Sequence, residues 1–349
     1  MLFSTLVFLY AFLPAVIILY YLIRKEYRNR LLLLVSLIFF AWGGVTYTLI
    51  LAFSLVVNYV TGRLIHKWQD TNKARVALTV GVVLNLLILG IFKYADFVVD
   101  NLNYLVGMFS NFQMGNPGII LPLGISFYTF QAMSYIMDVY RKEAEVQKNF
   151  FKLSLYISFF PQLIAGPIVR YQYIAEQLTN RKSHRANFTY GIQRFVMGLS
   201  KKVLLANQFA IVADEIFSIS LNELNSTTAW IGVLAYTFQI YFDFSGYSDM
   251  AIGIGRMFGF RLPENFNFPY ISRSIREFWQ RWHMTLSVWF KNYLYFPLGG
   301  SRKGEARTII NLLIVFFATS IWHGASWNFV VWGMSHGFFM MLERLGLGK

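Results

Sequence analysis

Long apolar runs recur along the whole chain, and few charged residues separate them. The stretches 31–40 and 309–317 contain no charged residue. Charged residues make up 14% of the 349 residues, against about 25% in an average soluble domain. A water-soluble core cannot hide so many apolar residues with so few charges to cover them. The sequence therefore predicts an all-α protein that is embedded in lipid and crosses the membrane several times.

The first apolar segment, residues 2–23, is too long for the hydrophobic region of a signal peptide, and no basic residue precedes it. We therefore expect it to remain in the protein as a membrane helix. The sequence has no cysteine, which excludes disulfides, thiolate nucleophiles and cysteine metal sites. Any covalent chemistry must use another group.

The formal net charge of +14 would suggest nucleic-acid binding in a soluble protein. Here the Lys and Arg residues cluster between apolar segments, as they do in cytoplasmic loops that face anionic lipid. We expect membrane lipids as partners and no nucleic acid.

The basic connections alternate with uncharged or acidic ones, which predicts an orientation. The connection around Arg24 and Arg28 and the stretch 63–75 are basic, whereas 43–47 is uncharged and 96–116 has no Lys or Arg. The positive-inside rule places the basic connections in the cytoplasm. The N-terminus is therefore predicted to lie outside.

The segment 153–169 breaks this alternation, because basic residues flank both of its ends. They are Arg141, Lys142, Lys148 and Lys152 before it, and Arg170, Arg181, Lys182 and Arg185 after it. Its interior contains Pro161, Gly166 and Pro167, which interrupt helical hydrogen bonding that lipid cannot replace. We expect a re-entrant segment; a single Pro-kinked span remains the alternative.

The C-terminal third is strongly basic up to Arg307 and then ends in a predicted hairpin of spans 308–320 and 327–342. Within the basic region, residues 272–294 alternate aromatic with charged side chains, which predicts an interfacial or half-inserted helix. No low-complexity linker or repeat of fixed period interrupts the chain. Residues 1–349 are therefore predicted to form a single multi-pass membrane domain.

His323 lies between two apolar runs and is followed by Gly324, which allows close backbone approach. In an enzyme, a neutral imidazole is the usual general base for a hydroxyl or a thiol. The chain has no cysteine and no G-x-S-x-G elbow, so histidine-assisted direct acyl transfer remains open. A structural histidine that bonds between helices is the alternative.

His283 is the second candidate, as a catalytic group or as a residue that orients the first. Arg276, Arg281 and Lys291 surround it in the sequence. These three side chains suit the phosphates of a nucleotide-bearing donor or of a phosphopantetheine arm. The alternative is that they reach towards lipid phosphates.

Asp243 and Asp249 lie in a stretch rich in Gly and Ser, where they either cap a broken helix or pair with nearby arginines. Because no histidine accompanies them at ligand spacing, we expect no metal site. Aromatic residues make up 19% of the chain. Interfacial belts explain most of them, and an aromatic tunnel for an acyl or glycan substrate is the sharper interpretation.

Four runs resemble the signatures of the membrane-bound O-acyltransferase family: PLGISFYTFQ at 122–131, FPQLIAGP at 160–167, DFSGYSD at 243–249 and WHG at 322–324. Two more, REFWQRWHM at 276–284 and YFPLGG at 295–300, are similar to the branch that acetylates alginate. A fainter similarity leads to the proteins that transfer D-alanine to teichoic acid.

The resemblance implies a ring of tilted helices around a thin centre, with a tunnel in which His323 is catalytic and His283 is a second functional histidine. It implies acetyl transfer from a cytoplasmic donor, acetyl-coenzyme A in preference to an acylated carrier, and no tightly bound cofactor. The acceptor would be an exported polysaccharide, reached through a periplasmic acetyltransferase partner. The location would be the inner membrane of a bacterial cell.

Family members of the alginate branch continue beyond the position that matches residues 345–348, so the resemblance implies a chain truncated at its C-terminus. Two other classes of function stay open. A transporter or flippase would also use intramembrane histidines and acids, but the inverted repeats typical of transporters are not apparent. A non-catalytic scaffold of a polysaccharide-modifying complex is the other alternative.

Overall fold

The computed structural model describes residues 2–181, 184–220 and 222–347, and within these ranges it consists of helices and connecting segments, without a strand. Among them, four helical rods are long and apolar enough to cross a membrane: α3 (Val45–Lys67), α4 (Asn72–Gly107), the rod Arg185–Phe217 and α15 (Glu305–His323). The prediction of an all-α, multi-pass membrane protein is confirmed. Lys182 and Lys349, which belong to predicted basic segments, lie outside the described residues.

The other helices are shorter, more polar or more deeply buried than these four. The N-terminal ones are α1 (Leu13–Leu22), α2 (Arg28–Ala41), α5 (Ile125–Tyr140), α6 (Phe150–Ser158), α7 (Phe160–Leu163), α8 (Tyr171–Ile174) and α9 (Gln177–Asn180). The rod Arg185–Phe217 comprises α10 (Arg185–Ser200), a π-helical turn (Lys201–Ala206) and α11 (Asn207–Phe217). After it come α12 (Ser226–Met257), α13 (Ile275–Arg281), α14 (Met284–Phe290), a π-helical turn (Lys291–Tyr295) and α16 (Trp327–Leu342).

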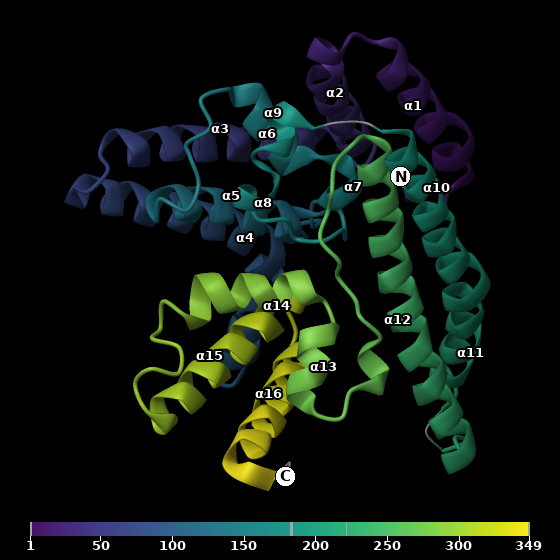
Figure 1. The fold of residues 1–349 in the computed structure, drawn as a ribbon. Coiled ribbons are helices and arrows are strands. Elements are labelled where there is room, and N and C mark those ends of the chain that lie inside the picture. The colour runs from purple at the N-terminus through teal and green to yellow at the C-terminus, as the bar shows by residue number, and fades with distance from the viewer. Residues whose placement is uncertain (1, 182–183, 221, 348–349) are drawn as a thin grey trace.

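Most of these helices form three groups around a central region, and α1 and α2 make a separate pair (Figure 1). Helices α3, α4 and α5 pack side by side, α10 and α11 run along α12, and α13 to α16 gather in a third group. The short helices α6 to α9 lie between the groups. Segments from both halves of the sequence therefore meet at the centre of the molecule.

Helix α5 occupies only the later part of an apolar stretch of the sequence. The apolar segment starts at Ile119, but the helix starts at Ile125, because Pro122 and Gly124 interrupt the chain before it. Gly124 has φ of +74°, and a Cβ there would lie 2.2 Å from the Leu163 carbonyl oxygen. Nearly every residue of α5 is buried within the protein, so this helix forms part of the centre and does not face lipid.

The two ends of the segment 153–169 lie close together in the structure. Helix α6 stops at Ser158, the short helix α7 follows, and an extended stretch leads back. The Tyr156 hydroxyl donates to the Val169 carbonyl at 2.8 Å, and Gln147 Nε2 donates to the Tyr171 hydroxyl at 3.2 Å. Because the two ends lie together, the geometry favours a re-entrant hairpin over a single kinked span. Its cytoplasmic side stays a prediction.

The stretch 243–249 is not a helix break, because α12 runs through it without interruption from Ser226 to Met257. Its glycines serve close packing instead: a Cβ on Gly198 of α10 would lie 2.5 Å from the Gly246 carbonyl oxygen. Small residues let membrane helices approach in this way. The expectation of a broken helix is therefore wrong.

The other possibility, pairing with arginines, is confirmed for Asp249 only, because the partner of Asp243 is a lysine. The carboxylate of Asp249 contacts Arg194 at 2.7 Å and Lys201 at 2.7 Å, and Asp243 contacts Lys202 at 2.8 Å. All three basic partners come from α10 and the π-helical turn after it. The two acids therefore attach α12 to its neighbour.

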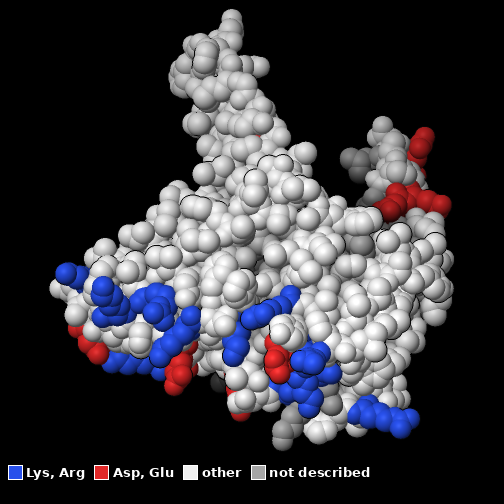
Figure 2. Space-filling model, turned by 90° about the horizontal axis from the view of Figure 1, so that it is seen from above, with Lys and Arg blue, Asp and Glu red and all other residues white. Residues whose placement is uncertain are grey.

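Lys and Arg side chains gather along one edge of the molecule in the view of Figure 2, and a wide surface without charges adjoins it. This is the asymmetry that the basic connections predicted. Near the same basic segments, residues 272–294 fold as two short helices, α13 and α14, with a break between them at Trp282 and His283.

Candidate active site

A cavity of about 340 Å³ contains both candidate histidines, His283 and His323. All four family-like runs of the sequence contribute to its wall, although they are far apart in the chain. The residues that represent them are Pro122, Gly124, Ile125, Ser126 and Phe127 from the first run, Ile164 and Ala165 from the second, Phe244 from the third, and Trp322 and His323 from the last. The fold thus brings the predicted catalytic residues together.

His323 is the last residue of α15, and a hydrogen bond to its own helix fixes its ring. The ring Nδ1 lies 2.8 Å from the Thr319 carbonyl oxygen. A carbonyl oxygen can only accept, so Nδ1 carries the proton and Nε2 carries the lone pair. Gly324 then ends the helix, and a Cβ there would lie 2.0 Å from the Phe329 ring.

His283 sits in the break between α13 and α14 with φ of +42° and ψ of 52°, a left-handed conformation that is uncommon for a residue with a side chain. It is almost fully buried. Its Nδ1 lies 3.1 Å from Asn265 Oδ1, which also accepts the backbone N–H of Thr285. That backbone donor identifies the Asn265 atom as oxygen, so Nδ1 of His283 carries the proton.

The other ring nitrogen of His283, Nε2, is buried and has no hydrogen-bond partner among the described residues. Both histidines therefore have the same tautomer, with a basic Nε2. Asn265, which fixes this tautomer for His283, was not singled out in the sequence. It lies in a loop outside every family-like run, and no local pattern marks it.

Aromatic rings enclose the two imidazoles. The Phe244 ring meets His283 edge-on at a centroid distance of 4.7 Å, and Trp322 lies 6.0 Å from His283 and 5.0 Å from His323. Phe127 stacks on His283 at 6.4 Å. These rings belong to the cavity wall, so part of the high aromatic content lines the interior of the protein.

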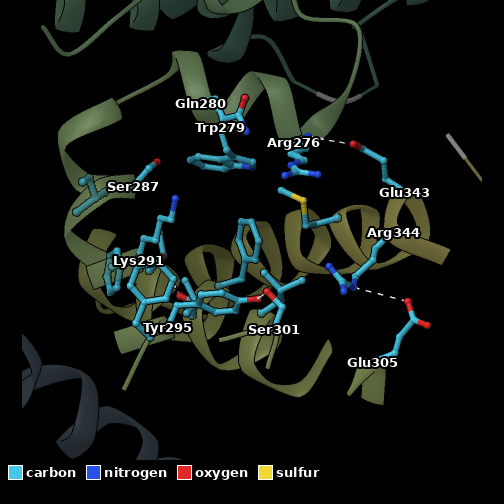
Figure 3. Close-up of a pocket in the computed structure, with 18 residues that line it drawn as sticks. Arg276, Trp279, Gln280, Ser287, Lys291, Tyr295, Ser301, Glu305, Glu343 and Arg344 are labelled. Carbon is cyan, nitrogen blue, oxygen red and sulfur yellow. Dashed lines mark hydrogen bonds and ion pairs between the residues drawn. The ribbon is translucent and has the colours of Figure 1, made fainter. Parts of the chain in front are cut away.

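A larger cavity, of about 790 Å³, lies among α13, α14, α15 and α16. Figure 3 shows the ends of the Arg276 and Lys291 side chains directed into it, together with Trp279, Gln280 and Ser287. Arg344, which follows α16 and pairs with Glu305 at 3.7 Å, also lines this cavity. It was not predicted, because it stands more than fifty residues from the other two basic residues.

The third predicted phosphate-binding residue, Arg281, is not part of this wall in the described structure. Its guanidinium pairs with Glu277 at 2.8 Å and donates to the Asn267 carbonyl at 3.1 Å. The backbone N–H of Arg273 and the Arg281 guanidinium hold the pKa of Glu277 below its usual range. The structure thus separates Arg281, which braces α13, from Arg276 and Lys291.

The cavities follow one another along α15. The larger one extends as far as Thr319, and the next helical turn, about 5.4 Å further, carries His323 in the smaller one. A third hollow of about 750 Å³ begins at Ala325 and reaches Phe97, Asp100 and Trp327.

Lys93 also lines the histidine cavity, and it was not among the predicted site residues. Its Nζ donates to the Trp322 carbonyl oxygen and to Ser126 Oγ at 3.3 Å. A signal was present: Lys93 is a charged residue far inside the long apolar helix α4, where ionisable groups mark function by default. No group of three or more His, Asp or Glu residues that could hold a metal ion occurs in the described ranges.

Comparison with known proteins gives consistent results. A family model for membrane-bound O-acyltransferases matches residues 141–346. The "Probable alginate O-acetylase AlgI" of Azotobacter vinelandii is 46% identical over 99% of this chain and 69% of its own length. The "Peptidoglycan O-acetyltransferase" of Helicobacter pylori is 40% identical over 99% of this chain and 70% of its own length.

A more distant relative is the "Teichoic acid D-alanyltransferase" of Bacillus subtilis, which is 31% identical over 62% of this chain and 58% of its own length. The first two relatives are longer than the chain described here, which spans about 70% of each. The relatives agree in one respect: each is named for the transfer of an acyl group to a cell-envelope polymer or exopolysaccharide.

Proposed function

The chain belongs to the membrane-bound O-acyltransferase family, and we propose that it passes an acetyl group from a cytoplasmic thioester donor towards an exported polysaccharide. The observation that carries this proposal is the cavity in which two histidines, each with a basic Nε2, meet all four family-like runs. The names of the alginate and peptidoglycan relatives support acetyl as the group and a glycan as the final acceptor.

In the proposed reaction, Nε2 of His323 takes the proton of the attacking hydroxyl as its oxygen bonds to the thioester carbonyl carbon. The carbon–sulfur bond then breaks, and the proton passes to the leaving sulfur. His283 assists from the same cavity, where Asn265 holds its ring. His283 is buried and His323 half-buried in this cavity, which limits the access of water that would otherwise hydrolyse the thioester.

Acetyl-coenzyme A is the proposed donor, held in the larger cavity with Arg276 and Lys291 on its phosphates. Arginine and lysine both bind phosphate through charge-assisted hydrogen bonds. Arg276 and Lys291, which line this cavity, belong to the basic region that ends at Arg307, and the positive-inside rule for such regions supports donor access from the cytoplasm. The acetyl group would leave on the other side, to a periplasmic acetyltransferase partner, with the N-terminus of this chain outside the inner membrane.

Thioester cleavage by the purified protein tests the proposal directly. With radiolabelled acetyl-coenzyme A, we expect release of the free thiol and transfer of label to an added hydroxyl acceptor. A transporter, a flippase or a non-catalytic scaffold would leave the thioester intact. The proposal is wrong if the protein binds the donor in membranes but releases no thiol above the level of a His323→Ala variant.

A further inference from the structure

The carbonyl groups at the end of α15 receive hydrogen bonds from two consecutive residues of α4. The Tyr94 hydroxyl donates to the Ile321 carbonyl oxygen, and Lys93 Nζ donates to the Trp322 carbonyl oxygen. The last carbonyls of a helix lack partners within it and carry partial negative charge, so a cation is stabilising there. Lys93 and Tyr94 therefore hold the helix end that carries His323.

Capping accounts for one of the three N–H donors of a lysine ammonium. A second donor goes to Ser126 Oγ at 3.3 Å. One donor thus remains unused by the described residues, and the Lys93 side chain lines the cavity that contains His283 and His323. In that cavity an additional acceptor, supplied by a ligand, would complete the hydrogen bonding of the ammonium.

Before the reaction starts, neither histidine can donate a hydrogen bond to a ligand oxygen in the cavity. The Nδ1 proton of His323 is used by Thr319, and that of His283 by Asn265. Their Nε2 atoms are acceptors. The indole Nε1 of Trp322 is a donor without a partner among the described residues, but it is neutral. Lys93 is the cationic side chain in the described wall of this cavity.

We propose that Lys93 stabilises the oxyanion of acyl transfer in the histidine cavity, so that it is a third catalytic residue beside His323 and His283. The step rests on the function proposed above. As the acceptor oxygen bonds to the carbonyl carbon, its proton moves to His323 Nε2 and the carbonyl electron pair moves onto the carbonyl oxygen. Lys93 donates to that oxyanion. When the carbonyl re-forms, the carbon–sulfur bond breaks and the sulfur takes the proton from His323.

Lys93 is half-buried, which favours this contribution. Hydrogen-bond donors that are aimed at developing charge act more strongly in a water-poor site than in water. Removing one oxyanion donor typically lowers kcat by about a hundredfold to a thousandfold. A lysine that only caps α15 would instead affect stability and would not respond to an anion in the cavity.

Binding of a small oxyanion tests the site without requiring turnover. Trifluoroacetate is titrated into the detergent-purified protein and followed by fluorine NMR. We expect saturable binding that is lost in Lys93→Gln and kept in Lys93→Arg. Gln is chosen because its amide can still donate to the Trp322 carbonyl, which preserves the cap. Tyr94→Phe is the matched control: it removes the neighbouring cap hydrogen bond but leaves the charge in the cavity, so anion binding should persist.

Turnover of acetyl-coenzyme A is the second readout. We expect Lys93→Gln to lower kcat by about a hundredfold to a thousandfold with little change in KM, and Lys93→Arg to restore part of it. If a folded Lys93→Gln variant binds trifluoroacetate as the parent does, Lys93 does not hold an oxyanion, whatever the parent catalyses. If binding depends on Lys93 but the parent cleaves no thioester, the anion site stands and the proposed function fails.

Discussion

Two regions of this protein bury charged or titratable groups, and they differ in how completely those groups are paired. Between α10 and α12, the Asp249 carboxylate is bonded through both oxygens, to Arg194 and to Lys201. In the histidine cavity, His283 Nε2 and Trp322 Nε1 have no partner among the described residues. One N–H of the Lys93 ammonium makes no hydrogen bond to the described residues.

Full pairing is what a structural contact requires, because a buried charge without a partner is costly. Buried polar groups without a partner around a cavity lower the stability of the fold. Such groups are therefore typical of a functional site. We therefore expect the two clusters of polar residues to have different roles. Substitutions in one should change stability, and substitutions in the other should change turnover.

The largest expected effect is on catalysis. His323→Ala should lower acetyl transfer by about a hundredfold to ten-thousandfold, as expected for loss of a general base. The yield of folded protein should remain near that of the parent, because the only described hydrogen bond of the ring is to its own helix. Radiolabel transfer in purified samples of equal folded content is the measurement.

His336 provides the control for this experiment, since it is a partly buried histidine of α16 that lines none of the three cavities. His336→Ala should keep most of the activity. Full activity in His323→Ala would mean that His323 has a structural role, and that the histidine cavity does not differ from the α10–α12 contact in the way proposed.

The next effect is on stability. Asp249→Asn removes the described counter-charge of Lys201 and leaves Arg194 paired with Glu264 alone. We expect the free energy of unfolding to fall by roughly 2–4 kcal/mol, less than for a fully enclosed pair because both basic partners are partly exposed. Turnover per folded molecule should not change. Thermal unfolding in detergent and activity are measured on the same samples.

The exposed ion pair of Lys142 with Asp70, at the same 2.7 Å, is the matched control. Asp70→Asn should cost at most about 1 kcal/mol, and Asn tolerates the left-handed backbone that Asp70 adopts. Equal losses in the two variants would mean that burial of Asp249 does not decide the effect.

A smaller effect is expected on donor affinity. Arg276→Ala and Lys291→Ala should each weaken binding of acetyl-coenzyme A by roughly 1.5–3 kcal/mol, the range of a charge-assisted hydrogen bond. Arg281→Ala distinguishes two expectations: the sequence predicts that Arg281 binds donor phosphates, whereas the structure gives it other partners. If all three residues hold donor phosphates, it weakens binding as much as the other two.

The geometry favours the opposite result for Arg281, because Glu277 and Asn267 already occupy its guanidinium. Calorimetric titration in one detergent compares the three variants. Unchanged affinity in both Arg276→Ala and Lys291→Ala would leave these residues as lipid-facing charges and would separate the larger cavity from the donor.

The last prediction involves no change in activity. Glu143→Cys and Glu176→Cys place single thiols on the two sides of the re-entrant segment, in a chain without native cysteine. A membrane-impermeant thiol reagent should reach both from the cytoplasm and neither from outside. If one position were labelled only from the cytoplasm and the other only from outside, the segment would be a single kinked span. The predicted orientation of the chain on one side of that segment would then be wrong.

The sequence by itself determined that this protein is embedded in a membrane and which histidines are the candidates for its site. Hydropathy and charge spacing are local properties, so they predicted the membrane helices and the interruption around Pro161. The family-like runs identified His323 and His283 as the residues to examine, and the structure places both in one cavity. The prediction of an O-acyltransferase is likewise confirmed at the level of the family.

Only the tertiary structure decided how these residues work together. The hydrogen bond from Lys93 to the Trp322 carbonyl joins positions 229 residues apart, and the one from His283 to Asn265 reaches a loop without a recognisable sequence pattern. Local signals also misled where packing overruled them: glycines near Asp249 suggested a helix break, yet they allow α10 and α12 to touch. Partner choice, as in the pairing of Arg281 with Glu277, depends on distances in space, and these distances do not follow from spacing along the chain.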